Sequence, residues 1–137
     1  AQEYRMGLHT PNPYREFERK AYLHRSDLRE LIKSIVNTNQ KVAGYGASTK
    51  GNVILQFCNL TNSEIFGIAE INEDKFGNFT PGSKIPIMSE SNIKKENPDY
   101  MIVLPWHFRE NIIEREKNYL SKGGKLIFPL PEIEIVG

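Results

Sequence analysis

The strongest constraint on the fold of this chain is a glycine-rich turn that joins a short apolar strand to an apolar helix. Residues 41–55 read KVAGYGASTKGNVIL. In α/β proteins, glycines in such a turn let the backbone approach a phosphate, and the unpaired N–H groups and dipole of the following helix favour an anion. The segment predicts a phosphate-binding strand–loop–helix unit, and its candidate binding residues are Gly44, Gly46, Ala47, Ser48, Thr49, Lys50 and Gly51.

The spacing of these glycines does not identify the ligand. The dinucleotide pattern G-x-G-x-x-G requires glycine where Thr49 stands, and a P-loop requires glycine before its lysine, whereas here Lys50 precedes Gly51. The alternative is that the glycines serve only strand-to-helix packing. A cation in the first turn of a helix opposes the helix dipole unless an anion is present, so Lys50 favours the binding interpretation.

Composition limits the class of protein. The chain of 137 residues is long enough for one domain, and its net charge of +1 gives no general attraction to nucleic acid or to a membrane. It has no apolar run of about 18 residues that would span a bilayer. Its single cysteine, Cys58, has no disulfide partner and no metal-ligand spacing, which indicates a reducing, cytoplasmic compartment and no metal site in this chain.

Short apolar segments alternate with helical patterns along the chain, which predicts an α/β fold with an open, parallel, Rossmann-like sheet of strand order 3-2-1-4-5. A long N-terminal helix is expected from Pro13 to Val36 and another helix from Phe108 to Leu120. After the glycine-rich unit, strands are expected at Ile65–Glu70, Ile85–Met88, Tyr100–Leu104 and Lys125–Phe128, with an edge strand at Glu132–Ile135.

The domain organisation expected from these elements has two parts. Residues 1–40 form an N-terminal arm and the long helix, and residues 41–137 form a single Rossmann-like, nucleotide-binding domain. The long helix exceeds what a small sheet needs to cover one face, and the chain begins at Ala1 with a polar arm. We therefore expect a fragment of a longer protein, in which part of this helix packs on another domain.

In an open parallel sheet, ligands bind beyond the carboxyl ends of the strands. Glu70 and Asn72 lie there after the second strand, and Glu70 follows the glycine-rich turn by about twenty residues, where a ribose-binding acid stands in dinucleotide folds. The alternative for Glu70 is a solvated strand end.

Three more candidates follow the fourth strand: Trp106, His107 and Arg109. Trp106 either stacks on a base or packs under the next helix. His107 is placed to contact a phosphate or to move a proton, but no adjacent carboxylate marks it as a general base. We expect Trp106 and His107 to line one crevice with Gly46 and Lys50, and we assign no catalytic residue in this chain.

Four separated blocks carry a family resemblance: GYGASTKGN at 44–52, TPGSKIPI at 80–87, PDYMIVLPWHFR at 98–109 and GGKLIFPLP at 123–131. Together they resemble the C-terminal domain of S-adenosylmethionine-dependent sugar C-methyltransferases, which methylate carbon 3 of a nucleotide-linked keto-deoxysugar. The family usually has Asp-Arg-Asn after the second strand. This chain has Glu70-Ile71-Asn72, which keeps an acid and Asn72 but lacks the arginine.

The resemblance implies a three-part enzyme with a zinc-binding N-terminal domain, a middle domain that binds S-adenosylmethionine, and this C-terminal domain. It implies that the donor, the zinc and the general base belong to the missing N-terminal and methyl-donor domains of the same chain. The present chain then holds the nucleotide-diphosphate sugar, binds no cofactor itself and is inactive alone. Two other functions stay open: a stand-alone regulatory module that binds a dinucleotide or coenzyme A, with Glu70 on a ribose hydroxyl, and a purely structural domain.

Overall fold

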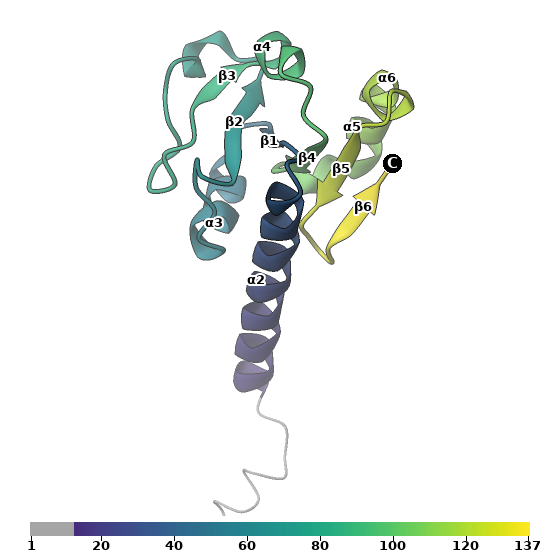
Figure 1. Ribbon diagram of the computed structural model, residues 1–137. Coiled ribbons are helices and arrows are strands. Elements are labelled where there is room, and N and C mark those ends of the chain that lie inside the picture. Colours follow the sequence, from purple (N-terminus) through teal and green to yellow (C-terminus); the bar gives the residue numbers. More distant parts are fainter. Residues whose placement is uncertain (1–12) are drawn as a thin grey trace, which may run out of the picture.

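The computed structural model describes residues 13–137, which form a six-stranded sheet of order β3-β2-β1-β4-β5-β6 (Figure 1). The five strands from β3 to β5 are parallel, and β6 pairs with β5 in the antiparallel direction. The strands are β1 (Val42–Tyr45), β2 (Ile65–Glu70), β3 (Ile87–Ser89), β4 (Tyr100–Val103), β5 (Lys125–Phe128) and β6 (Glu134–Val136).

Helices cover both faces of this sheet. One apolar cluster joins the sheet to α2 (Pro13–Asn37) and α3 (Thr49–Phe57). A second cluster joins the other face to α4 (Glu90–Lys95), α5 (Arg109–Arg115) and α6 (Lys117–Ser121). The short 3-10 turns η1 (Glu73–Lys75) and η2 (Trp106–Phe108) follow β2 and β4. β1 and β4 are adjacent and their crossovers leave on opposite faces, so the point where the strand order reverses lies between them.

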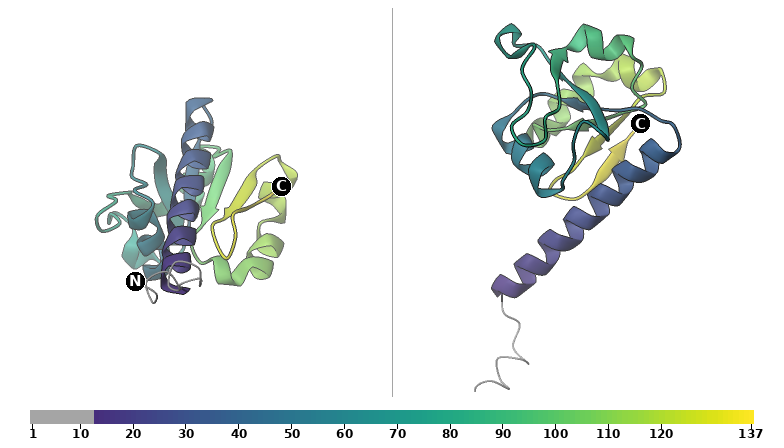
Figure 2. Two further views of the ribbon diagram at one scale, coloured as in Figure 1. Left: turned by 90° about the horizontal axis from the view of Figure 1, so that it is seen from below. Right: turned by 60° about the vertical axis from the view of Figure 1, so that its left-hand side comes forward.

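Only the C-terminal half of α2 belongs to the core. Leu28, Ile32 and Ile35 are buried against the sheet, and a ring nitrogen of His24 is hydrogen-bonded to the carbonyl oxygen of Pro129. The N-terminal half extends away from the sheet (Figure 2). No helix within residues 13–137 is long and apolar enough to cross a membrane.

The α/β class, the long N-terminal helix and the order of the first five strands confirm the sequence-based prediction. The expected arm at residues 1–12 lies outside the described part of the chain. The predicted edge strand exists at Glu134–Val136, but it is antiparallel because a short turn, rather than a crossover, joins it to β5.

Three local expectations were wrong. α4 was not expected, because Ile93 is its one buried residue and gives no helical periodicity. The strand expected at Ile85–Met88 begins at Ile87, after Pro86, which cannot donate a hydrogen bond to the sheet. The helix expected at Phe108–Leu120 divides into α5 and α6 at Glu116, whose φ of −98° and ψ of 23° depart from helical values and whose side chain is buried.

Gly51 sets how closely α3 approaches the end of β4. A Cβ atom at this position would lie 2.3 Å from Leu104 Cβ and 2.8 Å from Ser48 Oγ. Real Cβ atoms do not approach so closely, so any side chain would push α3 away from the sheet. Gly44 plays a similar part inside the sheet, because its Cβ would lie 2.9 Å from Ile68 Cγ1 on β2.

Replacing Gly51 with alanine should therefore destabilise the protein, although alanine has the higher helix propensity. We expect a loss of about 1–3 kcal/mol in the free energy of unfolding, the usual cost of overpacking, measured by urea denaturation. Val53→Ala on the same helix is the control, since Val53 is 60% exposed and its change should stay within about 0.5 kcal/mol. Equal stability of the two variants would show that α3 is not held this closely.

Candidate functional site

The loop from Gly46 to Ser48 lies where the carboxyl ends of β1, β2 and β4 meet. Gly46 has a φ of +80°, which favours glycine, and its N–H donates to the carbonyl oxygen of Ala69 at 2.8 Å. A Cβ atom on Gly46 would lie 3.0 Å from Pro105 Cδ, in the segment after β4. The loops that follow β1 and β4 are therefore in contact, and any side chain at position 46 would be strained.

The carboxylate of Glu70 fixes this loop. Its Oε1 accepts the N–H of Ala47 at 3.0 Å, and its Oε2 accepts the N–H groups of Ile71 at 2.8 Å and Asn72 at 3.0 Å. Lys75 lies 3.8 Å from the carboxylate and donates to the carbonyl oxygen of Ala47 at 2.8 Å. The side chain of Glu70 is only 10% exposed, so it is not a solvated strand end.

These contacts change the acidity of Glu70. Burial alone would raise the pKa of its carboxyl group, but the backbone N–H groups of Asn72, Ile71 and Ala47 and the charge of Lys75 outweigh burial and lower that pKa. Glu70 is therefore ionised at neutral pH. The ribose contact expected for Glu70 stays a prediction, and both of its oxygens already accept backbone N–H groups.

The N-terminus of α3 follows the loop directly. Ser48 caps the helix by accepting the N–H of Gly51 at 3.0 Å. The N–H groups of Thr49 and Lys50 have no hydrogen-bond partner within residues 13–137. The ammonium group of Lys50 is exposed and forms no ion pair in the same range. Two free donors and one unpaired cation thus stand beside the glycine-rich loop, an arrangement suited to an anion.

Two hollows flank the loop and share Ala47 and Ser48. We call the first the α3 hollow; it has a volume of about 320 Å³ and is also lined by Asn52, Lys75, Phe79 and Thr80. Asn52 Oδ1 is buried there and has no hydrogen-bond partner in the described chain. The ring of Phe79 is 62% exposed. A flat ring with a hydrogen-bond donor would satisfy both side chains, by stacking and by pairing.

The second, which we call the α5 hollow, has a volume of about 290 Å³. Its lining includes Gly46, Glu70, Pro105, Phe108 and Arg115. The phenyl ring of Phe108 is 54% exposed, and the guanidinium group of Arg115 donates to Glu90 Oε2 at 2.7 Å. This hollow therefore combines an apolar wall with a cation that is already held in place.

A buried polar network lies next to the α5 hollow. Glu116, at the junction of α5 and α6, accepts the hydroxyl of Tyr45 at 3.0 Å and the ammonium group of Lys94 at 2.7 Å. Lys94 also reaches Glu90 at 3.3 Å. Burial, together with the Glu116 carboxylate, raises the pKa of Tyr45, so its hydroxyl keeps its proton at neutral pH. The network ties the end of β1 to α4 and α5.

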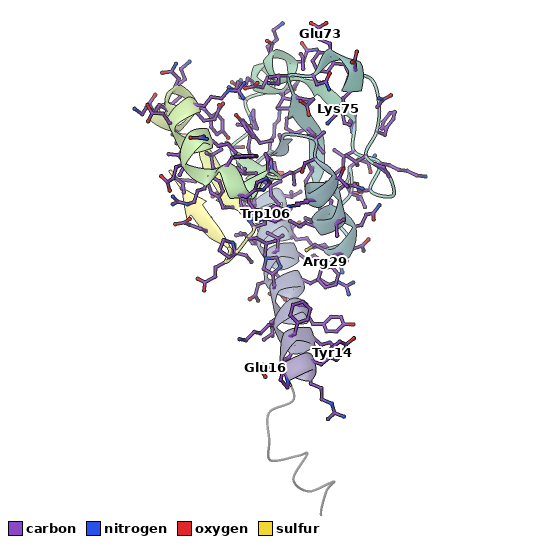
Figure 3. The ribbon with its side chains drawn as sticks, turned by 180° about the vertical axis from the view of Figure 1, so that it is seen from behind. Tyr14, Glu16, Arg29, Glu73, Lys75 and Trp106 are labelled. Atoms are coloured by element: carbon purple, nitrogen blue, oxygen red, sulfur yellow. The ribbon has the colours of Figure 1, made fainter. Side chains whose placement is uncertain are left out.

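The three candidates after β4 are placed differently. Trp106 is partly buried and packs against both apolar clusters, within the body of the fold (Figure 3). His107 is exposed and lies edge-on to Trp106, with ring centroids 5.6 Å apart. Arg109 pairs with Glu134 of β6 at 2.8 Å and with Glu110, and its guanidinium lies over the ring of Phe128.

The structure brings the predicted glycine-rich loop together with several residues outside the predicted set. Pro105 and Phe108, rather than Trp106 and His107, line the α5 hollow together with Gly46. Asn72 donates its N–H to Glu70 Oε2 and caps η1 with its side chain, so it is linked to the loop only through Glu70. The lining residues that sequence reasoning did not consider are Phe79, Phe108 and Arg115. One signal was present, because three of the four resemblance blocks contribute lining residues.

No group of three or more His, Cys, Asp or Glu side chains within residues 13–137 is arranged to hold a metal ion. Cys58 is buried, and burial raises the pKa of its thiol to about 11. This thiol is therefore protonated at neutral pH.

The Glu70 contacts predict a pH-dependent stability. Because folding lowers the pKa of Glu70, its contribution is present above its ordinary pKa of 4.5 and is lost as the pH falls below that value. At pH 7, Glu70→Gln should lower the free energy of unfolding by about 1.5–3 kcal/mol, the range for hydrogen bonds to a charged group. Urea denaturation at pH 7 and pH 3 should show the difference shrinking at acid pH. Glu73→Gln, an exposed neighbour, should change little at either pH.

Comparison with known proteins identifies the family of this chain. Residues 1–131 match the family model described as the C-methyltransferase C-terminal domain. The chain is 38% identical over 136 residues to the C-methyltransferase NovU of Streptomyces niveus. That match covers 99% of this chain and 32% of the relative, so the chain spans about a third of the length of that protein. The chain therefore belongs to the family of C-methyltransferase C-terminal domains.

Proposed function

We propose that this chain is the substrate-binding C-terminal domain of an S-adenosylmethionine-dependent enzyme that methylates a carbon atom of a nucleotide-linked keto-deoxysugar. Its ligand is the nucleotide-diphosphate sugar, and it belongs to one polypeptide with a zinc-binding domain and a methyl-donor domain. The enzyme works in the cytoplasm. Residues 1–40 are its N-terminal arm and long helix, and residues 41–137 are its Rossmann-like substrate-binding domain.

The single observation that carries this proposal is the set of free donors at the glycine-rich loop. The N–H groups of Thr49 and Lys50 and the ammonium group of Lys50 lack partners among the described residues. A diphosphate supplies the acceptors and the negative charge that these groups need. The loop is held rigid by Glu70, so little conformational entropy is lost when it binds.

The two hollows beside the loop suit the two ends of such a ligand. We place the base in the α3 hollow, where Phe79 offers a ring to stack on and Asn52 Oδ1 needs a donor. The sugar then lies toward the α5 hollow, beside the apolar ring of Phe108. In this arrangement the chain fixes the diphosphate and so positions the reacting carbon of the sugar relative to the methyl donor.

The residues of this chain do not fit the zinc ion or the methyl donor of the proposed enzyme. A zinc site of the cysteine type needs several thiolates, and the chain has one buried cysteine. The carboxylate of Glu70 accepts the backbone N–H of Ala47 in the glycine-rich loop, rather than a group of the methyl donor. We therefore assign the base that enolises the sugar, and the binding of the methyl donor, to other domains of the enzyme.

The proposal predicts a specific ligand preference for the isolated chain. Calorimetric titration should detect thymidine diphosphate but not S-adenosylmethionine, and the chain should have no methyltransferase activity. NAD and coenzyme A are titrated as alternative ligands, because a regulatory module would bind one of them instead. Stoichiometric binding of S-adenosylmethionine would overturn the assignment of the donor site to another domain.

Lys50 provides the sharper test of where the diphosphate lies. Reversing an exposed charge next to a diphosphate should weaken binding by about tenfold or more, since each unit charge pair at 4 Å is worth about 1 kcal/mol in water. We expect this loss for Lys50→Glu in the same titration, with no fall in melting temperature, because an acid in the first turn of α3 favours the helix. The matched control is Lys122→Glu, an exposed lysine just before β5 on the opposite rim of the sheet. Equal affinities of the two variants would move the ligand away from the loop.

A further inference from the structure

An apolar stripe on α2 continues beyond the sheet that buries it. Leu28 and Ile32 are fully buried, Ala21 is half-buried, and Phe17 on the same side of the helix is 71% exposed. Residues at these spacings lie on one face of an α-helix. Twenty-five residues give α2 a length of roughly 37 Å, whereas a four-residue strand such as β1 spans roughly 13 Å. The sheet therefore cannot cover the N-terminal half of the helix (Figure 2).

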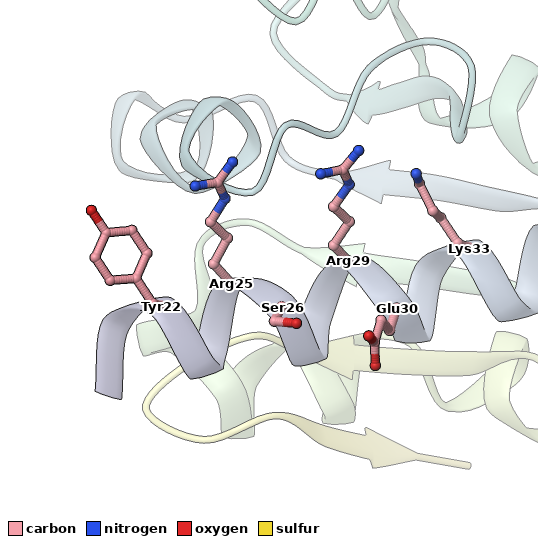
Figure 4. Close-up of a pocket in the computed structure, with 6 residues that line it drawn as sticks. All are labelled: Tyr22, Arg25, Ser26, Arg29, Glu30 and Lys33. Atoms are coloured by element: carbon pink, nitrogen blue, oxygen red, sulfur yellow. The ribbon is translucent and has the colours of Figure 1, made fainter. Parts of the chain in front are cut away.

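A row of cations runs beside this stripe. Arg25, Arg29 and Lys33 point to the same side of α2, while Glu30 points away from them (Figure 4). None of the three cations forms an ion pair within residues 13–137. Arg29 Nε is buried and lacks an acceptor in that range. With Tyr22, which is 59% exposed, they line a hollow of about 420 Å³. We call Arg25, Arg29 and Lys33 the basic row.

The basic row lacks compensation within the described chain. Like charges four residues apart on a helix repel one another, and a buried N–H without an acceptor destabilises the fold. The ring of Phe57 lies under Arg25, at 5.8 Å from its guanidinium carbon, and contacts Tyr22 at 6.4 Å between ring centroids. The surface therefore combines exposed aromatic rings with unpaired cations. A protein surface with both apolar groups and carboxylates matches it better than a small anion does.

We propose that Phe17, Ala21 and Tyr22 together with the basic row form the docking surface for the rest of the same enzyme, through an apolar patch bordered by carboxylates. This inference rests on the proposed function, because it requires the longer polypeptide. The relative from Streptomyces niveus has about two-thirds of its length outside the region that matches this chain. The surface lies on the first described helix, next to the side from which that preceding polypeptide enters.

Amide hydrogen exchange compares the isolated chain with the longer enzyme. In the isolated chain the amides of residues 17–21 should exchange rapidly, because these turns of α2 precede the part that is buried against the sheet. In the longer enzyme the same amides should be protected at least about tenfold, while those of α3 stay unchanged. Unprotected residues 17–21 in the longer enzyme would overturn the proposal.

Charge reversal tests the chemistry of the contact. The preceding portion of the enzyme, produced as a separate polypeptide, is titrated with the isolated chain. Arg25→Glu combined with Lys33→Glu should weaken binding by about tenfold to hundredfold, and Phe17→Ser should weaken it as well. Lys95→Glu combined with Lys122→Glu is the control, since it changes the net charge equally on α4 and after α6.

The melting temperature of each isolated variant shows that folding is intact, because Phe17 is exposed and contributes little to the core. Binding that survives all changes on α2 would overturn the proposal, as would self-association of the isolated chain that these changes abolish. Binding of thymidine diphosphate to the isolated chain is measured in parallel. Absence of docking by the unchanged chain, together with normal nucleotide binding, would contradict this inference and leave the proposed function standing.

Discussion

The site depends on one carboxylate. Glu70 ends β2, and its oxygens accept N–H groups from the loops after two adjacent strands: Ala47 after β1, and Ile71 and Asn72 after β2 itself. Without Glu70, three N–H groups at the rim would lack acceptors, and the loop that carries Gly46 would lose its fixed position. Glu70 accepts the N–H of Ala47, just before α3. The N–H groups left for a ligand are therefore those in the first turn of α3.

Glu116 plays a comparable part on the other face of the sheet. It is buried between Tyr45 and Lys94, and the chain leaves helical geometry at this residue so that its carboxylate can reach both. A buried charge is costly unless it is paired and hydrogen-bonded, and here both conditions are met. One break in the α5–α6 helix thus secures the end of β1, from which the glycine-rich loop departs.

Glu70 and Glu116 also show how much of the fold and of the site could be predicted from the sequence. The fold class, the order of the first five strands and the glycine-rich loop follow from apolar runs and turn residues, which are local signals. The role of Glu70 could not be predicted, because its main partners are backbone N–H groups, one of them 23 residues away. Arg115 gave no signal either, since a surface arginine is ordinary until the fold places it beside the loop. Arg109 was predicted as a candidate from its position after the fourth strand, and in the structure it forms an ion pair with Glu134.

The long helix shows how one sequence pattern serves two purposes. Its apolar positions keep the same spacing from Phe17 to Ile35, but the sheet covers only the last part of them. A helix designed solely to close one face of the sheet would end its apolar stripe where the sheet ends. In α2 the stripe continues beyond the sheet, and the basic row runs beside its buried part on another side of the helix. The C-terminal half of α2 therefore belongs to the fold of this chain, and the N-terminal half has the character of an interface.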